Sequence, residues 1–198
     1  MIRRIGPWLR LGLCLGGFSA SVGCVAQPVG DTGTGAAPPV GTPSRYRSAE
    51  FQFTFDYPPD WTIASQGVAS LTLVPDGLQT WQPETPADIP KDPRIIVEMG
   101  ALIQERLGAA DFPAIPDADH LRAWLEQKTV NGQAQDLSDR MINQVQAFEI
   151  IERSLPGCTR VVYWRPGDLK RLVRIAAGCE SAYPDDFAEI VNSLQQTE

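Results

Sequence analysis

Histidine is almost absent from this chain of 198 residues, in which His120 is the only one. A serine or cysteine triad would therefore have to use His120, and zinc would lack the several His or Cys ligands that it usually takes. The sequence also contains no G-x-S-x-G nucleophile elbow and no glycine-rich phosphate-binding motif. These absences argue against the common hydrolase, zinc and nucleotide-binding classes.

Basic residues are also scarce, with 17 Lys and Arg against 24 Asp and Glu and a net charge of −7. Residues 1–23 contain three Arg and no acidic residue, so the rest of the chain carries a net charge near −10. Such a surface repels nucleic acid, and we expect no nucleic-acid partner. It favours basic partners or loosely held cations, and solubility alone would also explain it.

No apolar run in the leader is long enough to span a bilayer. Three arginines, a short apolar stretch and a run of small residues instead form an export signal over residues 1–23. Cys24 follows at once, and Ser21-Val22-Gly23-Cys24 resembles the lipid-accepting site of bacterial lipoproteins. This resemblance implies a lipidated Cys24 and a protein that faces the periplasm or the thylakoid lumen. The alternative is an ordinary signal cleaved nearby, for example after Ala26, with Cys24 discarded.

The segment after Cys24 predicts a flexible tether. Residues 27–44 are nearly all Gly, Pro, Thr, Ala and Val, carry almost no charge and lack the apolar periodicity of a core element. We therefore assign residues 24–45 to the lipidated cysteine and its tether. Residues 46–198 have the length of one ordinary domain and show no internal repeats.

The patterning of this domain predicts more strands than helices. Aromatic residues alternate with polar ones from Phe51 to Tyr57, which is the period of a half-buried strand, and Pro58-Pro59 ends it. Further strands are expected at Trp61–Ile63, Leu71–Val74, Arg94–Ile103 and Gln144–Leu155. Five prolines from Pro75 to Pro93, both included, indicate a long loop, either functional or mobile.

Two segments have the apolar spacing of helices. The first follows Asp117 and Asp119 and buries residues from Leu121 to Leu125. The second begins at Pro184 and carries an apolar stripe from Phe187 to Leu194. Because hairpins connect most of the strands, we predict an α+β fold in which an antiparallel sheet is covered by helices.

The remaining two cysteines, Cys158 and Cys179, are expected to form a disulfide, because exported proteins meet oxidising conditions. They flank two strand-like runs, and a four-residue loop at Gly167–Lys170 would set Trp164 opposite Val173. The same register sets Cys158 opposite Cys179. Closing this loop would contribute roughly 3 kcal/mol to stability. The alternative is a pair of free, buried thiols.

The sequence offers few other candidate groups for metal binding or catalysis. The pairs Asp117-Asp119 and Asp185-Asp186 offer oxygen ligands for calcium, but the starts of the two helices already explain them. His120 lies in the first turn of a helix, which disfavours the protonated imidazole. We therefore expect no metal and no cofactor.

Aromatic residues suggest a second hypothesis, a groove that stacks a sugar, pigment or peptide. The candidates are Tyr57, Trp61, Trp81 and Trp164. Tyr57 and Trp61 occupy positions typical of a core. Trp81 lies among polar residues of the proline-rich loop, where an exposed ring would suit contact with a partner, although it could also fold back on the domain.

The pattern F-x-F-x-F-x-Y-P-P-x-W from Phe51 to Trp61 resembles the opening strand of the PsbP family, the extrinsic proteins of photosystem II and their relatives. The carboxy-terminal part of that family's domain is also similar to this chain, which has Leu172–Ile175, then Tyr183-Pro184 and a helix that ends in Val191–Leu194. The resemblance covers residues 46–74 and 158–196. It implies an α/β sandwich and attachment to a membrane protein complex, and a lipid-anchored form is known among cyanobacterial relatives.

These observations favour a non-enzymatic, membrane-anchored lipoprotein whose PsbP-like domain binds a membrane protein complex or helps to assemble it. Photosystem II is the complex that the resemblance implies. One alternative is a carrier of a small apolar or sugar ligand, and another is a cryptic hydrolase that uses His120.

Overall fold

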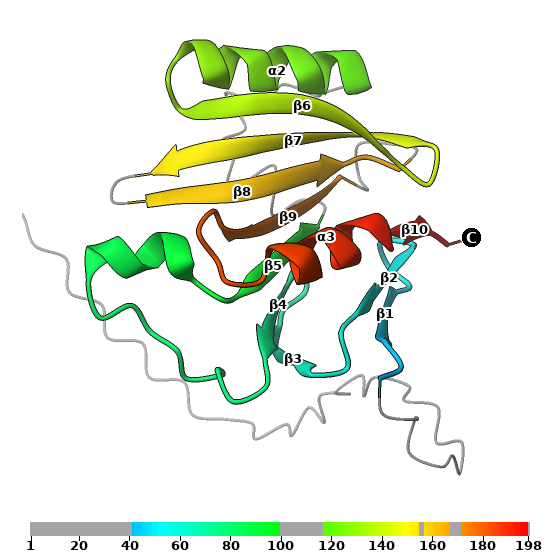
Figure 1. Ribbon diagram of the computed structural model, residues 1–198. Coiled ribbons are helices and arrows are strands. Elements are labelled where there is room, and N and C mark those ends of the chain that lie inside the picture. Colours follow the sequence, from blue (N-terminus) through cyan, green and yellow to red (C-terminus); the bar gives the residue numbers. More distant parts are fainter. Residues whose placement is uncertain (1–40, 100–116, 155–156, 167–171, 198) are drawn as a thin grey trace, which may run out of the picture. The chain divides into compact units, whose positions relative to one another are not determined.

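The computed structural model describes residues 41–99, 117–154, 157–166 and 172–197, and these residues form mainly β-strands (Figure 1). The strands of the first half are β1 (Ser44–Ser48), β2 (Phe53–Tyr57), β3 (Trp61–Gln66), β4 (Ser70–Pro75) and β5 (Ile95–Met99). Those of the second half are β6 (Ala134–Ile142), β7 (Val145–Ser154), β8 (Gly157–Trp164), β9 (Val173–Gly178) and β10 (Gln195–Gln196). The described helical segments are the 3-10 helix η1 (Pro86–Lys91), α2 (Ala118–Val130) and α3 (Pro184–Asn192). Antiparallel sheet therefore dominates the fold, and helices are few.

β2 is the central strand of a three-stranded antiparallel sheet, between β1 and β10. Phe53 and Phe55 are fully buried, as the alternation of aromatic residues predicts. The strand begins two residues later than expected, because Gln52 has a φ of 51°, which interrupts an extended chain. Phe51 therefore lies outside the strand and packs, half-buried, against the core.

The larger sheet has seven strands in the order β3-β4-β5-β9-β8-β7-β6, and every neighbouring pair is antiparallel. β8 and β9 pair in the predicted register, with Trp164 opposite Val173. This register brings the Cα atoms of Cys158 and Cys179 to 5.6 Å, and the two residues form the predicted disulfide. The turn expected at residues 167–170 lies outside the described residues, as do residues 100–103 of the strand expected from Arg94.

β6, at one edge of the described sheet, is a strand that the patterning did not predict. A β-bulge between Gln135 and Ser138, where Asp136 has a φ of 58°, breaks the alternation of its side chains. Asn143 and Gln144, with φ values of 47° and 67°, make the turn into β7. Positive φ at both positions is the geometry of a tight hairpin turn. β6 and β7 therefore form a hairpin.

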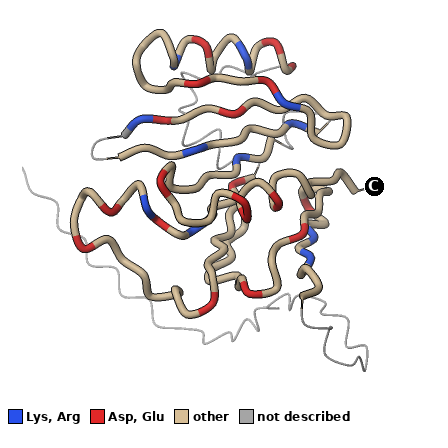
Figure 2. The backbone as a smooth tube through the Cα atoms, in the orientation of Figure 1, with Lys and Arg blue, Asp and Glu red and all other residues tan. Residues whose placement is uncertain are grey.

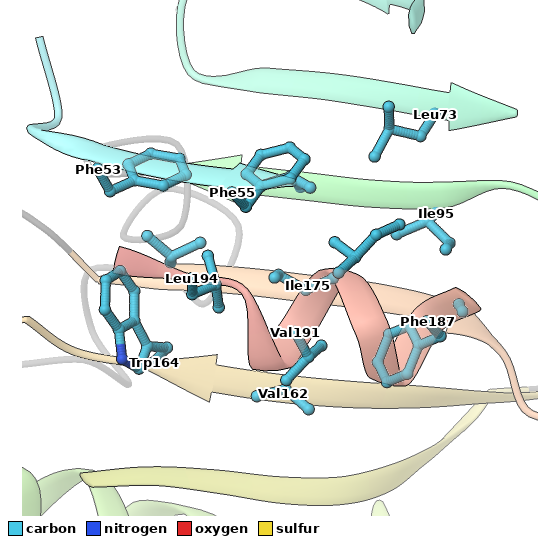
Figure 3. Close-up of a cluster of buried hydrophobic side chains, with 14 of the residues drawn as sticks. Phe53, Phe55, Leu73, Ile95, Val162, Trp164, Ile175, Phe187, Val191 and Leu194 are labelled. Carbon is cyan, nitrogen blue, oxygen red and sulfur yellow. The ribbon is translucent and has the colours of Figure 1, made fainter. Parts of the chain in front are cut away.

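α2 and α3 lie on opposite faces of the seven-stranded sheet, each over its own apolar cluster. Figure 3 shows the α3 side, where Phe187, Val191 and Leu194 meet side chains from β2, β8 and β9. On the other side Leu121 and Leu125 of α2 contact the sheet. Both helices were predicted from their spacing. Alternate residues of β8 face the two clusters, as the period of a strand requires.

The proline-rich segment is not one continuous loop, because it contains η1. Pro90 is buried against the ends of β8 and β9. A Cβ atom at Gly178 would come within 2.9 Å of the Pro90 carbonyl carbon, and one at Gly157 within 3.1 Å of the Pro90 ring. The backbone N–H of Glu180 donates to the Pro90 carbonyl at 2.8 Å. Two glycines at the strand ends thus let η1 lie directly on the sheet.

The described residues fall within one compact unit, Pro38–Glu198. No helix in this described part of the chain is long and apolar enough to cross a bilayer. The predicted signal peptide, Cys24 and nearly all of the tether lie outside the described residues. The last two residues assigned to the tether, Ser44 and Arg45, instead begin β1 and pair with β2.

Candidate functional site

Basic residues are interspersed with acidic ones along β6 to β9 (Figure 2). Three charged side chains of these strands meet on the face that α3 covers. Glu149 of β7 accepts a hydrogen bond of 2.7 Å from Nη1 of Arg140 on β6. It accepts another of 2.5 Å from Nε of Arg160 on β8. We call Arg140, Glu149 and Arg160 the arginine cluster. With two guanidinium groups and one carboxylate it carries a net charge of +1 in a chain of net charge −7.

Helix α3 holds the arginine cluster in place. Nη2 of Arg140 donates to Oδ1 of Asn192 at 2.7 Å, and the guanidinium carbon of Arg160 lies 5.2 Å from the centroid of the Phe187 ring. The second contact has the geometry of a cation–π interaction. Among the residues that the structure describes, the terminal Nη groups of Arg160 have no hydrogen-bond partner. Arg160 is thus fixed through Nε and its flat face, and its Nη groups remain available.

An open cleft of about 470 Å³ lies beside the arginine cluster. Its lining includes Asp136, Ser138, Glu149, Ile151, Arg160 and Cys179. A narrower hollow shares Arg160 and Cys179 with this cleft and extends to Phe187 at the start of α3. The cleft therefore combines a guanidinium group, carboxylates, a hydroxyl group and a disulfide on the surface of a hydrogen-bonded sheet.

The disulfide also lies within the one group of three potential metal ligands found among the described residues, which is Cys158, Cys179 and Glu180. The sulfur atoms of Cys158 and Cys179 form a disulfide bond, so neither is a thiolate ligand. Neither predicted acidic pair, Asp117-Asp119 or Asp185-Asp186, belongs to such a group in the described part of the chain. Calcium binding therefore gains no support.

A second ionic network lies on the opposite face, between α2 and the sheet. Arg174 donates to Glu98 at 2.7 Å and to Glu152 at 2.8 Å, while Lys128 and the Tyr163 hydroxyl each donate to Glu152 at 2.8 Å. Burial alone would raise the pKa of Glu152, but the charges of Arg174 and Lys128 outweigh it and lower that pKa to about 2. Burial, reinforced by Glu152, raises the pKa of Tyr163. These groups stay in one protonation state near neutrality, so they suit a structural role better than proton transfer.

The structure places His120 on the surface of α2, with its Nδ1 atom 2.8 Å from Oδ1 of Asp117. Asp117 caps the helix by accepting a hydrogen bond of 2.9 Å from the backbone N–H of His120. The hydrogen bonds from the ring and from the backbone N–H of His120 lower the pKa of Asp117. The side chain that contacts the histidine ring is therefore a helix cap, as expected for a surface position. Cys158 and Cys179 are bonded to each other, so neither is a free thiol.

The hypothesis of an aromatic groove gains no support from the described residues. Trp61 is buried in the core and Tyr57 packs against the same cluster, as their positions predict, and Trp164 is buried there too. Trp81 is half-buried, and the guanidinium carbon of Arg94 lies 5.6 Å from the centroid of its ring. Contact between Trp81 and a partner stays a prediction.

The arginine cluster and the cleft escaped prediction. Arg160 and Glu149 occupy positions in expected strands, and two opposite charges on antiparallel neighbours are a signal for an ion pair. Their pairing follows only from the register of β7 and β8, in which Glu149 lies opposite Val162. Arg140 and Asp136 belong to β6, the strand that the patterning did not predict.

Several solved structures are similar to this chain. The first is CyanoP, the cyanobacterial PsbP of Synechocystis, with a TM-score of 0.50 and 13% identity over 84% of this chain and 99% of that one. A Bacteroides thetaiotaomicron protein has a TM-score of 0.41 and 12% identity, covering 78% of this chain and 48% of that one. The Ran-binding protein Mog1p of Saccharomyces cerevisiae has a TM-score of 0.40 and 11% identity over 80% and 97% of the two chains.

The likeness to CyanoP shows that the chain has a PsbP-like fold, and at this identity it shows the fold alone. No protein-family model and no curated protein matches the chain.

Proposed function

We propose that this protein is a non-enzymatic lipoprotein whose PsbP-like domain binds a membrane protein complex. The observation that carries the proposal is the polar cleft beside the arginine cluster. Its walls come from β6, β7 and β8, so the recognition groups stand on a hydrogen-bonded sheet and lose little freedom on binding. Such a preorganised polar surface suits the recognition of another protein.

The proposal includes export and anchoring. Residues 1–23 act as the signal peptide, Cys24 carries the lipid, and the residues between Cys24 and β1 tether the PsbP-like domain, which begins at Ser44. The domain then faces the periplasm or the thylakoid lumen. Photosystem II is the complex suggested by the resemblance of Phe51–Trp61 to the PsbP family.

The alternative functions have weaker support. A carrier needs an apolar or aromatic cavity, but Trp61 and Trp164 fill the core instead. A hydrolase needs a base directed at a nucleophile, whereas the ring of His120 contacts the helix-capping Asp117. We therefore expect His120→Ala to leave the cellular phenotype unchanged.

The test is site-specific photocrosslinking in native membranes. A benzophenone amino acid replaces Ser138, which is exposed in the cleft, and in a control chain it replaces Val130, which is 85% exposed at the end of α2. We expect one crosslinked membrane protein from position 138 and not from position 130. Equal products from both positions, or none from position 138, would contradict binding through the cleft.

A further inference from the structure

We propose that the cleft binds an acidic segment of the partner protein and that a carboxylate of this segment pairs with Arg160. The inference deepens the proposed function and rests on it, because it specifies what the partner presents. It follows from the geometry of Arg160, from the charge of the arginine cluster and from the other groups that line the cleft.

Arg160 is presented as a preorganised carboxylate receptor. Its Nε atom is held by Glu149 at 2.5 Å, and its guanidinium carbon lies 5.2 Å from the Phe187 ring centroid. These two contacts fix the plane of the guanidinium group and leave the Nη groups free of hydrogen bonds to described residues. The planar fork of arginine matches the two oxygens of a carboxylate, and a fork already held in place loses less entropy when it binds.

The charge of the arginine cluster calls for one further anion. Glu149 is shared between Arg140 and Arg160, so one positive charge is left without a partner inside the cluster. The side chains of the three residues are between 17% and 33% exposed, so solvent only partly screens this charge. A carboxylate from a partner would neutralise it.

The rest of the cleft favours one carboxylate on a polypeptide over a polyanion. Asp136 lines the same cleft, and the chain as a whole has a net charge of −7, so phosphate-rich ligands and nucleic acid are repelled. Ser138 offers a hydroxyl group for a backbone hydrogen bond, while Ile151 and Cys179 offer apolar contact. A polypeptide segment with a single acidic side chain matches this combination.

The test is an NMR titration of the isotope-labelled full-length chain in detergent micelles. The probes are the peptide acetyl-AAEAA-amide and its neutral counterpart acetyl-AAQAA-amide. We expect the Glu peptide to shift the backbone amides of residues 136–138, 149–151 and 158–160, and the Gln peptide to leave them in place. Equal shifts with the two peptides, or shifts confined to other elements, would overturn the proposal.

Variants assign the effect to Arg160. Arg160→Gln should raise the Kd of the Glu peptide about tenfold, which corresponds to the loss of one charge-assisted hydrogen-bonded pair. Arg45→Gln is the matched control, because it removes an equal charge from the Arg45–Asp56 pair across β1 and β2. Its Kd should equal that of the wild type. The dispersion of the same spectra shows whether each variant is folded.

A third variant tests the proposal without disturbing the arginine cluster. Asp136→Asn removes the repelling carboxylate, and asparagine tolerates the positive φ at this position. We expect its Kd for the Glu peptide to fall about threefold, which is the size of an exposed charge interaction. An unchanged or higher Kd would count against the proposal.

The photocrosslink at position 138 separates this inference from the proposed function. If Arg160→Gln abolishes a crosslink that the wild type forms, both are supported. If the variant still crosslinks the same protein as efficiently, the proposed function stands and the acidic-segment inference is overturned. A wild-type chain that discriminates the two peptides but forms no crosslink contradicts the proposed function and leaves the carboxylate site supported.

Discussion

Among the described glycines, Gly178 leaves the least room for a side chain, because the carbonyl group of Pro90 lies where its Cβ would be. We expect Gly178→Ala to lower the free energy of unfolding by about 2 kcal/mol, because η1 would have to move off the sheet. Urea denaturation measures the loss. Gly67→Ala is the control, since its Cβ would meet only ordinary contacts, the nearest at 3.4 Å from Ser70. Equal stability of the two variants would show that Pro90 shifts freely.

Prediction at the residue scale succeeded where a local pattern determines the partner. Cys158 and Cys179 are related by the register of one hairpin, which the sequence between them contains. Asp117 was recognised as a helix start because caps act over three residues. The partners of Arg160 come from Glu149 and Phe187, on elements distant in the sequence, and no local pattern encodes such contacts.

At the scale of elements, Glu152 links α2 to the sheet, and its pKa makes this link depend on pH. The folded-state pKa of about 2 lies below the ordinary value of 4.5, so the contribution is fully present above pH 4.5 and is lost as pH falls towards 2. This shift corresponds to about 3 kcal/mol. Urea unfolding between pH 7 and pH 2.5 should show that Glu152→Gln is less stable than the wild type at pH 7 and loses less stability on acidification.

Asp139→Asn provides the comparison for Glu152→Gln. Asp139 of β6 pairs with Arg122 of α2, the helix that Glu152 also contacts, but both side chains are largely exposed. Exposed pairs contribute about 0–1 kcal/mol, so this variant should follow the pH profile of the wild type. Parallel profiles for the wild type and Glu152→Gln would contradict the role given to Glu152.

The β8–β9 pair depends on its disulfide. Cys158 and Cys179 are 21 residues apart, and opening this loop by the double change Cys158→Ser and Cys179→Ser should cost roughly 3 kcal/mol. Thermal unfolding should show a lower Tm for the double variant. Dithiothreitol should lower the Tm of the wild type to the same level and leave the double variant unaffected. A wild-type Tm that does not respond to complete reduction would contradict the prediction.

Elements were predictable where burial imposes a period. β4, β5 and β9 carry an apolar residue at every second position, because those positions face the core cluster on the α3 side. β6 is mainly polar at an edge of the described sheet, and its bulge shifts the alternation, so neither burial nor period marks it. η1 was missed because its prolines fit a loop as well as a 3-10 helix, and its contact with Gly178 is made in three dimensions.

At the scale of the whole molecule, the balance of strands and hairpins predicted an antiparallel sheet covered by helices. The antiparallel pairing is confirmed, but strands dominate and helices are few, and the Phe51–Trp61 pattern pointed to the PsbP-like fold. The partner could not be predicted in the same way. The proposed recognition uses the cleft, whose lining comes from strands that meet only after folding. A packing motif such as Phe51–Trp61 therefore carries information on the fold and little on the partner.

Membrane attachment of the whole chain should depend on Cys24. The chain beyond residue 23 has a net charge near −10, so anionic headgroups repel it and the surface of the domain gives no electrostatic anchor. We expect the wild type to incorporate labelled palmitate and to sediment with membranes, and Cys24→Ser to lose the label. One acyl chain holds a protein only marginally, so the proposed anchor would need several chains to hold the wild type in the membrane fraction through a high-salt wash.

Cleavage after Ala26 makes the opposite prediction. Both forms would then begin at Gln27, neither would carry palmitate, and the wild type and Cys24→Ser would fractionate alike. The mass of the mature amino-terminal peptide distinguishes the two cases, because an acylated Cys24 adds the mass of its chains. An unmodified peptide that starts at Gln27 would remove the anchor from the proposed function, and the cleft would then have to bind its partner from solution without the local concentration that a tether provides.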